Sequence, residues 1–347
     1  MKTIGFIMGT GLITESNDYI FKYKKQYSYL DELPKEFNYD PDEYGVDHDL
    51  QIYAELKLLE KKFNCNVVAI YGPTMTLEDL NKCDAVYCYY EFTYAMRDNG
   101  YEGVKKYFQL LQKTKAVVYP TVKTQKFILS KQTYMNFLKK KGFDIIPTKF
   151  VPISTYKKQK VKTIDSILDY IDREQYDDMI IKPELAGFAL GFKLFKNPTE
   201  TNIKKYMDQM VKNKYQKVLI QPYIQEFTKF WEFKMMWFNG VFHHAYGQKV
   251  HSLWEDDIDP TYEELLKSKH KPTLLKCKAK GNKIVKEIIQ EFGKQAVIRV
   301  DFGCCIDNDS ICREYFVNEV ECAPAMSDDE TKKNNLQSFA KAILTVT

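Results

Sequence analysis

The stretch from Val297 to Pro324 constrains the fold of this chain more than any other part. Residues 297–302 and 315–321 alternate, or nearly alternate, between apolar and charged side chains, which predicts two strands. The polar residues 307–310 between them suit a turn. The two strands are therefore expected to pair as an antiparallel hairpin with one charged face.

That face gathers three carboxylates and a guanidinium. Residues two apart on a strand point the same way, so Arg299 lies beside Asp301, and Glu319 lies beside Glu321. The carboxylates on such a face repel one another, and burying the face without a partner is costly. Hard oxygen donors with little His or Cys nearby favour Mg²⁺ over Zn²⁺. A solvated, charged hairpin is the alternative, and the hairpin alone does not decide between the two.

The composition is that of a globular protein. The 347 residues are 44% hydrophobic and 28% charged, enough for two or three subdomains with their own cores. No signal-peptide pattern is found, and no apolar run approaches the roughly 18 residues of a membrane span. A cytoplasmic protein without membrane attachment is expected.

The charge distribution argues against nucleic-acid binding, and the cysteine spacing argues against a zinc site or disulfides. The net charge of +4 is spread along the chain, so basic runs such as 139–141 are interpreted as solvated faces and nucleic acid is not an expected partner. The eight cysteines include no C-x-x-C pair. Buried free thiols are therefore expected, not a zinc site or disulfides.

The first 120 residues alternate predicted strands with predicted helices. The strands are expected at 2–8, 65–71, 85–89 and 116–119. The helices are expected at 47–63, 77–81 and 104–111. This alternation predicts an open, largely parallel α/β sheet.

A different pattern follows Pro120. Ser130 is expected to cap a helix over 131–141. Residues 184–191, with Gly187 and Gly191, lie between two predicted strands and suggest a flexible flap. Further strands are expected at 149–152, 179–183, 192–195, 217–224, 231–238 and 241–246, and further helices at 163–173, 201–212 and 280–292.

The order of these motifs resembles the ATP-grasp superfamily over about residues 85–325. The motifs are a lysine at a helix start, Lys-Pro before a glycine loop, Gln-Pro-Tyr-Ile, Trp-Glu-Phe-Lys, Arg-Val-Asp and Asn-Glu-Val-Glu. Within the superfamily the chain looks most like glutathione-synthetase-like and ribosomal-modification ligases and the cyclo-ligase of cycloserine biosynthesis. The resemblance implies an α/β chain with α+β character in its ATP-binding part. It also implies an N-terminal domain over 1–120, a central subdomain with the flap over 121–215 and a C-terminal subdomain over 216–347.

The resemblance also implies roles for individual residues. Asp301, Glu319 and Glu321 would hold Mg²⁺, as two ions, with Mn²⁺ as the alternative. Arg299 would stabilise an oxyanion or the transferred phosphoryl group, and Lys249 would contact phosphate or substrate. The residues implied in ATP binding are Lys131, Lys182, Gly187, Gly191, Gln221, Tyr223, Ile224 and Glu232. Of these, Gln221 to Ile224 would lie beside the adenine, and Glu232 would lie at or next to the ribose.

The activity implied is ATP-dependent formation of an amide or peptide bond through an acyl phosphate. The substrates would be a small-molecule or peptide carboxylate and an amine, and a homodimer is an open option. A small-molecule kinase on the same scaffold is the alternative, favoured by Lys234 where many ligases have Arg. A non-catalytic nucleotide-binding protein is a third hypothesis, suggested by the apolar residues of the flap.

Overall fold

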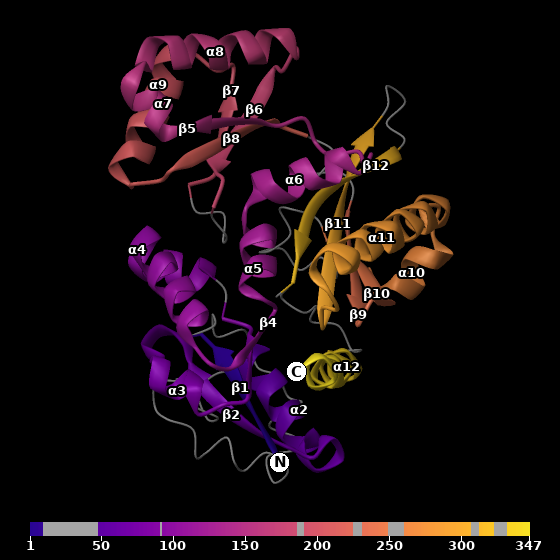
Figure 1. Cartoon of the computed structure of the whole chain (residues 1–347). Helices are drawn as coiled ribbons and strands as arrows, with labels where there is room; N and C mark the ends of the chain where they lie inside the picture. The colour runs from indigo at the N-terminus through magenta and orange to yellow at the C-terminus, as the bar shows by residue number, and fades with distance from the viewer. Residues whose placement is uncertain are drawn as a thin grey trace, which may run out of the picture.

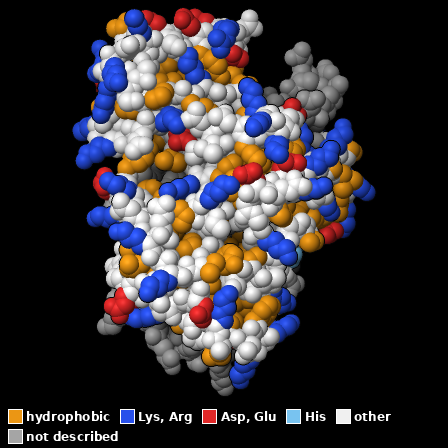
Figure 2. Space-filling model, viewed as in Figure 1, with side chains coloured by type: hydrophobic (Ala, Val, Ile, Leu, Met, Phe, Trp, Pro, Cys, Tyr) orange, Lys and Arg blue, Asp and Glu red, His pale blue; other side chains and the backbone are white. Residues whose placement is uncertain are grey.

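Three four-stranded sheets follow one another along the chain (Figure 1). The computed structural model describes residues 1–9, 48–90, 92–185, 191–224, 231–248, 260–306, 312–322 and 332–347. None of the helices in these ranges combines the length and apolar character that a membrane crossing needs. Lys and Arg side chains are scattered over the face seen in Figure 2, with acidic side chains between them.

The N-terminal sheet is open and parallel, as predicted. Its strands lie in the order β2-β1-β3-β4, and every pairing is parallel. The strands are β1 (Lys2–Met8), β2 (Cys65–Tyr71), β3 (Ala85–Cys88) and β4 (Val117–Tyr119). The helices of this part are α2 (His48–Phe63), α3 (Leu77–Asn81), α4 (Phe92–Lys113) and the 3-10 turn η4 (Gly72–Thr74).

Helix α4 is longer than the predicted 104–111. It begins at Phe92 and contains a kink at Gly100, whose φ of 60° and ψ of −154° are not helical. A positive φ is readily adopted by glycine, which has no Cβ. The kink divides the apolar periodicity, which explains why the pattern predicted only the second part of the helix.

The middle sheet is antiparallel and has its own core. Its strands lie in the order β5-β8-β6-β7. They are β5 (Lys149–Pro152), β6 (Asp178–Pro183), β7 (Lys193–Lys196) and β8 (Lys217–Pro222). Three helices gather around this sheet (Figure 1), α7 (Ile153–Lys158), α8 (Lys160–Arg173) and α9 (Glu200–Lys212).

Strand β8 lies inside this middle sheet, between β5 and β6. Ile220 pairs with Lys149 on one side and with Ile181 on the other. The predicted division of the chain assigned residues from 216 onward to the C-terminal part, so the strand belongs to a different sheet from the one expected. Local pattern predicts a strand but not its neighbours, because pairing is decided by tertiary packing.

The C-terminal sheet carries the predicted hairpin. Its order is β10-β9-β11-β12, with every pairing antiparallel. The strands are β9 (Glu232–Phe238), β10 (Val241–Gln248), β11 (Val297–Ile306) and β12 (Cys312–Glu321). The nearby helices are α5 (Val122–Leu129), α6 (Lys131–Lys140), α10 (Tyr262–Lys267) and α11 (Lys271–Phe292).

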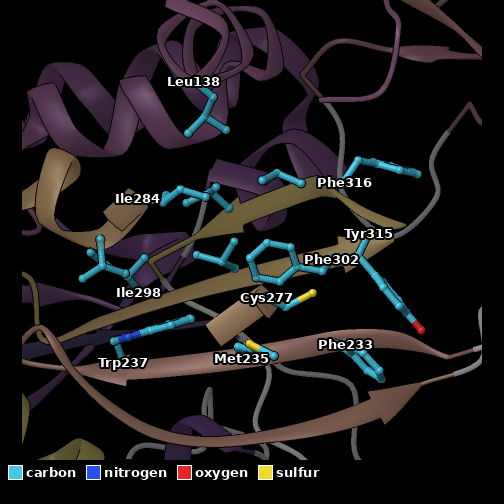
Figure 3. Close-up of a cluster of buried hydrophobic side chains, with 14 of the residues drawn as sticks. Leu138, Phe233, Met235, Trp237, Cys277, Ile284, Ile298, Phe302, Tyr315 and Phe316 are labelled. Atoms are coloured by element: carbon cyan, nitrogen blue, oxygen red, sulfur yellow. The ribbon is translucent and has the colours of Figure 1, made fainter. Parts of the chain in front are cut away.

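One face of the C-terminal sheet is apolar (Figure 3). Alternate residues of β9, among them Phe233 and Trp237, pack with Ile298 and Phe302 of β11 against α11. Burying a large apolar side chain stabilises the fold by roughly 1.5–3 kcal/mol. Since side chains alternate across a strand, the residues between these apolar ones point to the opposite face.

The last helix, α12 (Lys332–Val346), joins the first sheet to the third. Its Phe339 stacks on Phe238 of β9 with ring centroids 5.7 Å apart and meets Tyr87 of β3 edge-on at 6.2 Å. One hydrophobic core therefore runs through the N-terminal sheet, α2, α12 and part of the C-terminal sheet. The middle sheet keeps a separate core.

Candidate active site

The charged face of the C-terminal sheet is the candidate active site. Asp301 lies directly opposite Glu319 in the β11–β12 register, and Arg299 lies opposite Glu321. On the other side of β11, Asp301 lies opposite Lys234 of β9. The alternation that sends apolar side chains to the core therefore brings these charges together on the opposite face.

Asp301 is the most deeply buried of these groups, with 1% of its surface exposed. Arg299 donates to both of its oxygens, with distances of 2.7 Å from Nε to Oδ1 and 2.8 Å from Nη2 to Oδ2. Lys234 Nζ donates to Oδ2 at 3.0 Å. Paired guanidinium contacts of this kind are among the stronger hydrogen bonds in proteins, so Asp301 is held between two cations.

Lys234 joins a second carboxylate to this group. Its Nζ also lies 3.0 Å from Glu232 Oε2, while Asn318 Nδ2 donates to Glu232 Oε1 at 2.6 Å. Burial on its own would lower the pKa of Lys234, but Asp301 and Glu232 raise it well above the ordinary value. Lys234 is therefore a permanent cation in the centre of the charged face.

Glu319 and Glu321 lie on the edge strand and remain accessible, with 29% and 30% of their side chains exposed. Lys131 Nζ, from the first residue of α6, lies 3.2 Å from Glu319 Oε1. Arg299 Nη2 lies 2.9 Å from Glu321 Oε2. Burial would raise the pKa of Glu319, but Lys131 and then Lys182 lower it to about 2.

Lys182 reaches the same group of charges from strand β6 of the middle sheet. Burial lowers its pKa to about 8, and the charge of Lys131 acts in the same direction. Glu319 and Glu232 oppose the shift. A lysine of helix α6 and a lysine of strand β6 thus both approach Glu319, where each can meet an anion.

Gly191 ends the predicted flap where only glycine fits. Its φ is +72°, and a Cβ at this position would lie 2.7 Å from Cγ of Pro183. Its carbonyl oxygen accepts a hydrogen bond of 2.8 Å from the hydroxyl of Tyr206. Both the backbone conformation and the close approach require glycine here. Gly187 and Lys249 lie outside the described residues.

The predicted adenine-contacting stretch, Gln221 to Ile224, begins at the end of β8 and continues beyond it. Gln221 is buried and donates from Nε2 to Thr148 Oγ1 at 2.9 Å. The backbone N–H of Tyr223 donates to the carbonyl of Asp178 at 3.0 Å, and Ile224 packs beside the core of the C-terminal sheet. These contacts fix the chain between the two antiparallel sheets, and the contact with adenine stays a prediction.

The structure brings most of the predicted residues together and adds Lys234 to them. Glu232 was expected at the ribose, yet both of its oxygens have partners inside the charged network. Lys234 was read only as evidence for a kinase. The two-residue spacing of Glu232 and Lys234 could have predicted that they share one face of their own strand, but not that this face is the one of Asp301. Among the described residues, no three His, Cys, Asp or Glu side chains gather closely enough to hold a metal, since lysine and arginine lie between the carboxylates.

Comparisons with known proteins identify the fold. No family model matches the sequence, and no curated protein matches it. The structure is similar to a D-cycloserine synthetase, with 13% identity, 99% of each chain covered and a TM-score of 0.64. It is similar to the D-alanine–D-alanine ligase of Bacillus anthracis complexed with ATP, at 16% identity, with 99% and 97% covered and a TM-score of 0.56.

A third similar structure is a RimK domain ATP-grasp protein from Sphaerobacter thermophilus, at 11% identity. That comparison covers 86% of this chain and 94% of the other, with a TM-score of 0.53. The first two of these comparisons span nearly the whole of both chains, so the likeness includes the N-terminal sheet as well as the two antiparallel sheets. This chain has the ATP-grasp fold.

Proposed function

We propose that the protein is an ATP-dependent ligase that joins a carboxylate to an amine. The observation that carries the proposal is the approach of both Lys131 and Lys182 to Glu319 of β12. An anion as highly charged as a triphosphate needs cations that approach from more than one side. The similar structures include a ligase complexed with ATP, which supports the same reading.

The residues have distinct tasks in this proposal. Lys131 and Lys182 bind and neutralise the phosphates, and the flap that ends at Gly191 closes over them. The substrate carboxylate attacks the γ-phosphorus, ADP leaves, and the amine then displaces phosphate from the acyl phosphate. Arg299, held in place by Asp301 and Glu321, presents a fixed positive charge to the oxyanion that develops during this displacement.

Magnesium fits the donors of the edge strand. Glu319 and Glu321 offer hard oxygen atoms that are accessible, which suits Mg²⁺ and also Mn²⁺. Asp301 would have to share its oxygens with Arg299 and Lys234. A bound ion would neutralise charge on the β- and γ-phosphates and orient the transferred group.

The kinase alternative is not favoured. It rested on Lys234, but this lysine is engaged by Glu232 and Asp301 and stabilises the sheet face itself. The similar structures named above include two enzymes whose names describe synthesis or ligation. A small-molecule or peptide acid and an amine are the proposed substrates, acted on in the cytoplasm. The homodimer is a further proposal, as is the division of the chain into three parts, with β8 included in the central one.

The stoichiometry of phosphate release tests the proposal. Purified protein is incubated with ATP and Mg²⁺ and a panel of amino acids and short peptides, singly and in pairs. A ligase releases free phosphate and ADP in equal amounts only when an acid and an amine are both present. A phosphorylated product that appears without free phosphate would contradict the proposal and favour the kinase, and ATP left unchanged under every pairing would contradict both.

A further inference from the structure

Glu184 is a buried carboxylate that the proposed reaction does not use. It follows Lys182 by two residues, as the first residue of the predicted flap, and only 5% of its surface is exposed. Its Oε1 accepts a hydrogen bond of 2.5 Å from Ser130 Oγ and another of 3.2 Å from the backbone N–H of Gln132. Buried carboxylates are rare without a specific partner, and both partners here belong to the beginning of α6.

The first turn of α6 is therefore tied to the middle sheet. Ser130 caps the helix by accepting from the N–H of Thr133 and donates its own hydrogen to Glu184. An anion at a helix N-terminus is also favoured by the helix dipole. A second link runs alongside, because the ammonium group of Lys217 donates to the side-chain oxygen of Gln132. The backbone N–H of Glu184 in turn donates to the carbonyl of Lys217 at 3.0 Å.

These links cross between two separately packed parts of the molecule. Helix α6 packs through Tyr134, Met135 and Leu138 into the core of the C-terminal sheet. Glu184 extends from β6, and the middle sheet has its own core. Lys131 belongs to the first part and Lys182 to the second, so the distance between the two lysines depends on how these parts are joined.

We propose that Glu184 is a positioning residue that sets the spacing of the two phosphate-binding lysines. It holds the helix start that carries Lys131 against the strand that carries Lys182, without touching the nucleotide. This inference rests on the proposed binding of ATP at the same site. A misplacement of about 1 Å caused by a distant mutation can cost about 100-fold in rate, so the spacing of two groups that meet one ligand is sensitive to the contacts that hold them.

This role is tested by measuring the affinity for ligands that carry different numbers of phosphates. In Glu184→Ala, the dissociation constants of Mg·ATP and Mg·ADP should rise by about tenfold or more, the size of one lost charge-assisted contact. Adenosine, which has no phosphate, should bind as it does to the wild type. Glu184→Gln keeps an oxygen acceptor for Ser130 and Gln132, so it should restore affinity to within about threefold.

Two further variants separate positioning from general loss of stability. Glu60 is a matched control in the N-terminal part, since it also accepts from one backbone N–H, that of Val67, and from one side chain, that of Lys57. Glu60→Ala should leave nucleotide binding unchanged. Lys217→Met removes the parallel link and should weaken ATP and ADP binding in the same direction as Glu184→Ala, by a smaller factor.

The outcomes distinguish the inference from the function on which it rests. If the wild type binds ATP and Glu184→Ala binds it equally well, the positioning role alone is overturned. It is also overturned if Glu184→Ala loses as much affinity for adenosine as for ATP. Wild-type protein that binds neither ATP nor ADP would overturn the proposed function and this inference together. If Glu184→Ala does not fold, Glu184→Gln and Lys217→Met are compared with the wild type instead. An affinity for ATP and ADP that is unchanged in Lys217→Met would then contradict the inference.

Discussion

Asp301 and Glu319 are carboxylates that face each other across two paired strands, yet they have different environments. Asp301 lies on the inner strand β11, is 1% exposed, and is bound by Arg299 and Lys234. Glu319 lies on the edge strand β12, has 29% of its side chain exposed and meets Lys131, which comes from a helix. The fold thus uses one carboxylate to organise cations and presents the other to solvent.

The difference shows that the position of a charged group in the sheet decides whether it contributes mainly to stability or to binding. A buried ion pair is supported on all sides and is expensive to break, because removal of one partner leaves an uncompensated charge. An exposed pair adds little stability, because water already solvates both groups. Asp301 and Lys234 should therefore mainly determine the stability of the fold, and Glu319 and its neighbours should mainly determine binding.

Loss of Lys234 should have the largest effect on stability. Lys234→Met leaves Asp301 and Glu232 short of a cation inside the protein, which should lower the free energy of unfolding by about 3–5 kcal/mol. Lys160→Met is the matched control, because the Lys160–Asp208 pair is exposed, with 49% and 43% of the side chains accessible. The control should lose no more than about 1 kcal/mol. Urea unfolding followed by circular dichroism measures both, and equal losses would refute the division between inner and edge charges.

Glu319→Gln should separate activity from stability. Since Glu319 is partly exposed, the free energy of unfolding should fall by less than it does in Lys234→Met. Turnover of ATP with the correct acid and amine should fall by about 100-fold or more, the range seen when a preorganised electrostatic group is removed. Steady-state phosphate release and urea unfolding are measured on the same preparation. A variant with full activity and lowered stability would reverse the roles assigned to the two strands.

A smaller, pH-dependent effect should come from Lys182. Burial and the charge of Lys131 lower its pKa to about 8, so the free protein loses this ammonium group above that pH. The affinity for Mg·ATP should therefore be constant below pH 8 and fall by up to about tenfold per pH unit above it. Lys182→Arg, whose guanidinium stays protonated, should bind with no such decline. Calorimetric titration between pH 7 and 10 checks this, and an identical decline in both proteins would assign the effect to another group.

Alternation along the strands was enough to predict the hairpin and its charged face. Ile298, Val300 and Phe302 lie on one side of the strand and Arg299 and Asp301 on the other, and this alternation is a local property of the sequence. The lysine at the start of α6 was found in the same way, from the capping residue Ser130 before it.

Contacts that depend on tertiary neighbours were not predictable. The pairing of β9 with β11 sets Lys234 beside Asp301, although the two are 67 residues apart in the chain. Glu184 meets Ser130 over a separation of 54 residues. Helix α12 was missed, although its Phe339 joins the first and third sheets. Such packing is fixed by the assembled core, not by local pattern.

The most direct test of the account is the Mg²⁺ dependence of ATP binding in the wild type and in Glu319→Gln/Glu321→Gln. Isothermal titration calorimetry measures the affinity for ATP with excess Mg²⁺ and with a chelator. The wild type should bind ATP tightly only with Mg²⁺. The double variant should fold normally and bind ATP with the same weak affinity under both conditions, since Lys131 and Lys182 remain. Equal wild-type affinity with and without Mg²⁺, or full Mg²⁺ dependence in the double variant, would contradict the assignment of this sheet face as the site of Mg·ATP.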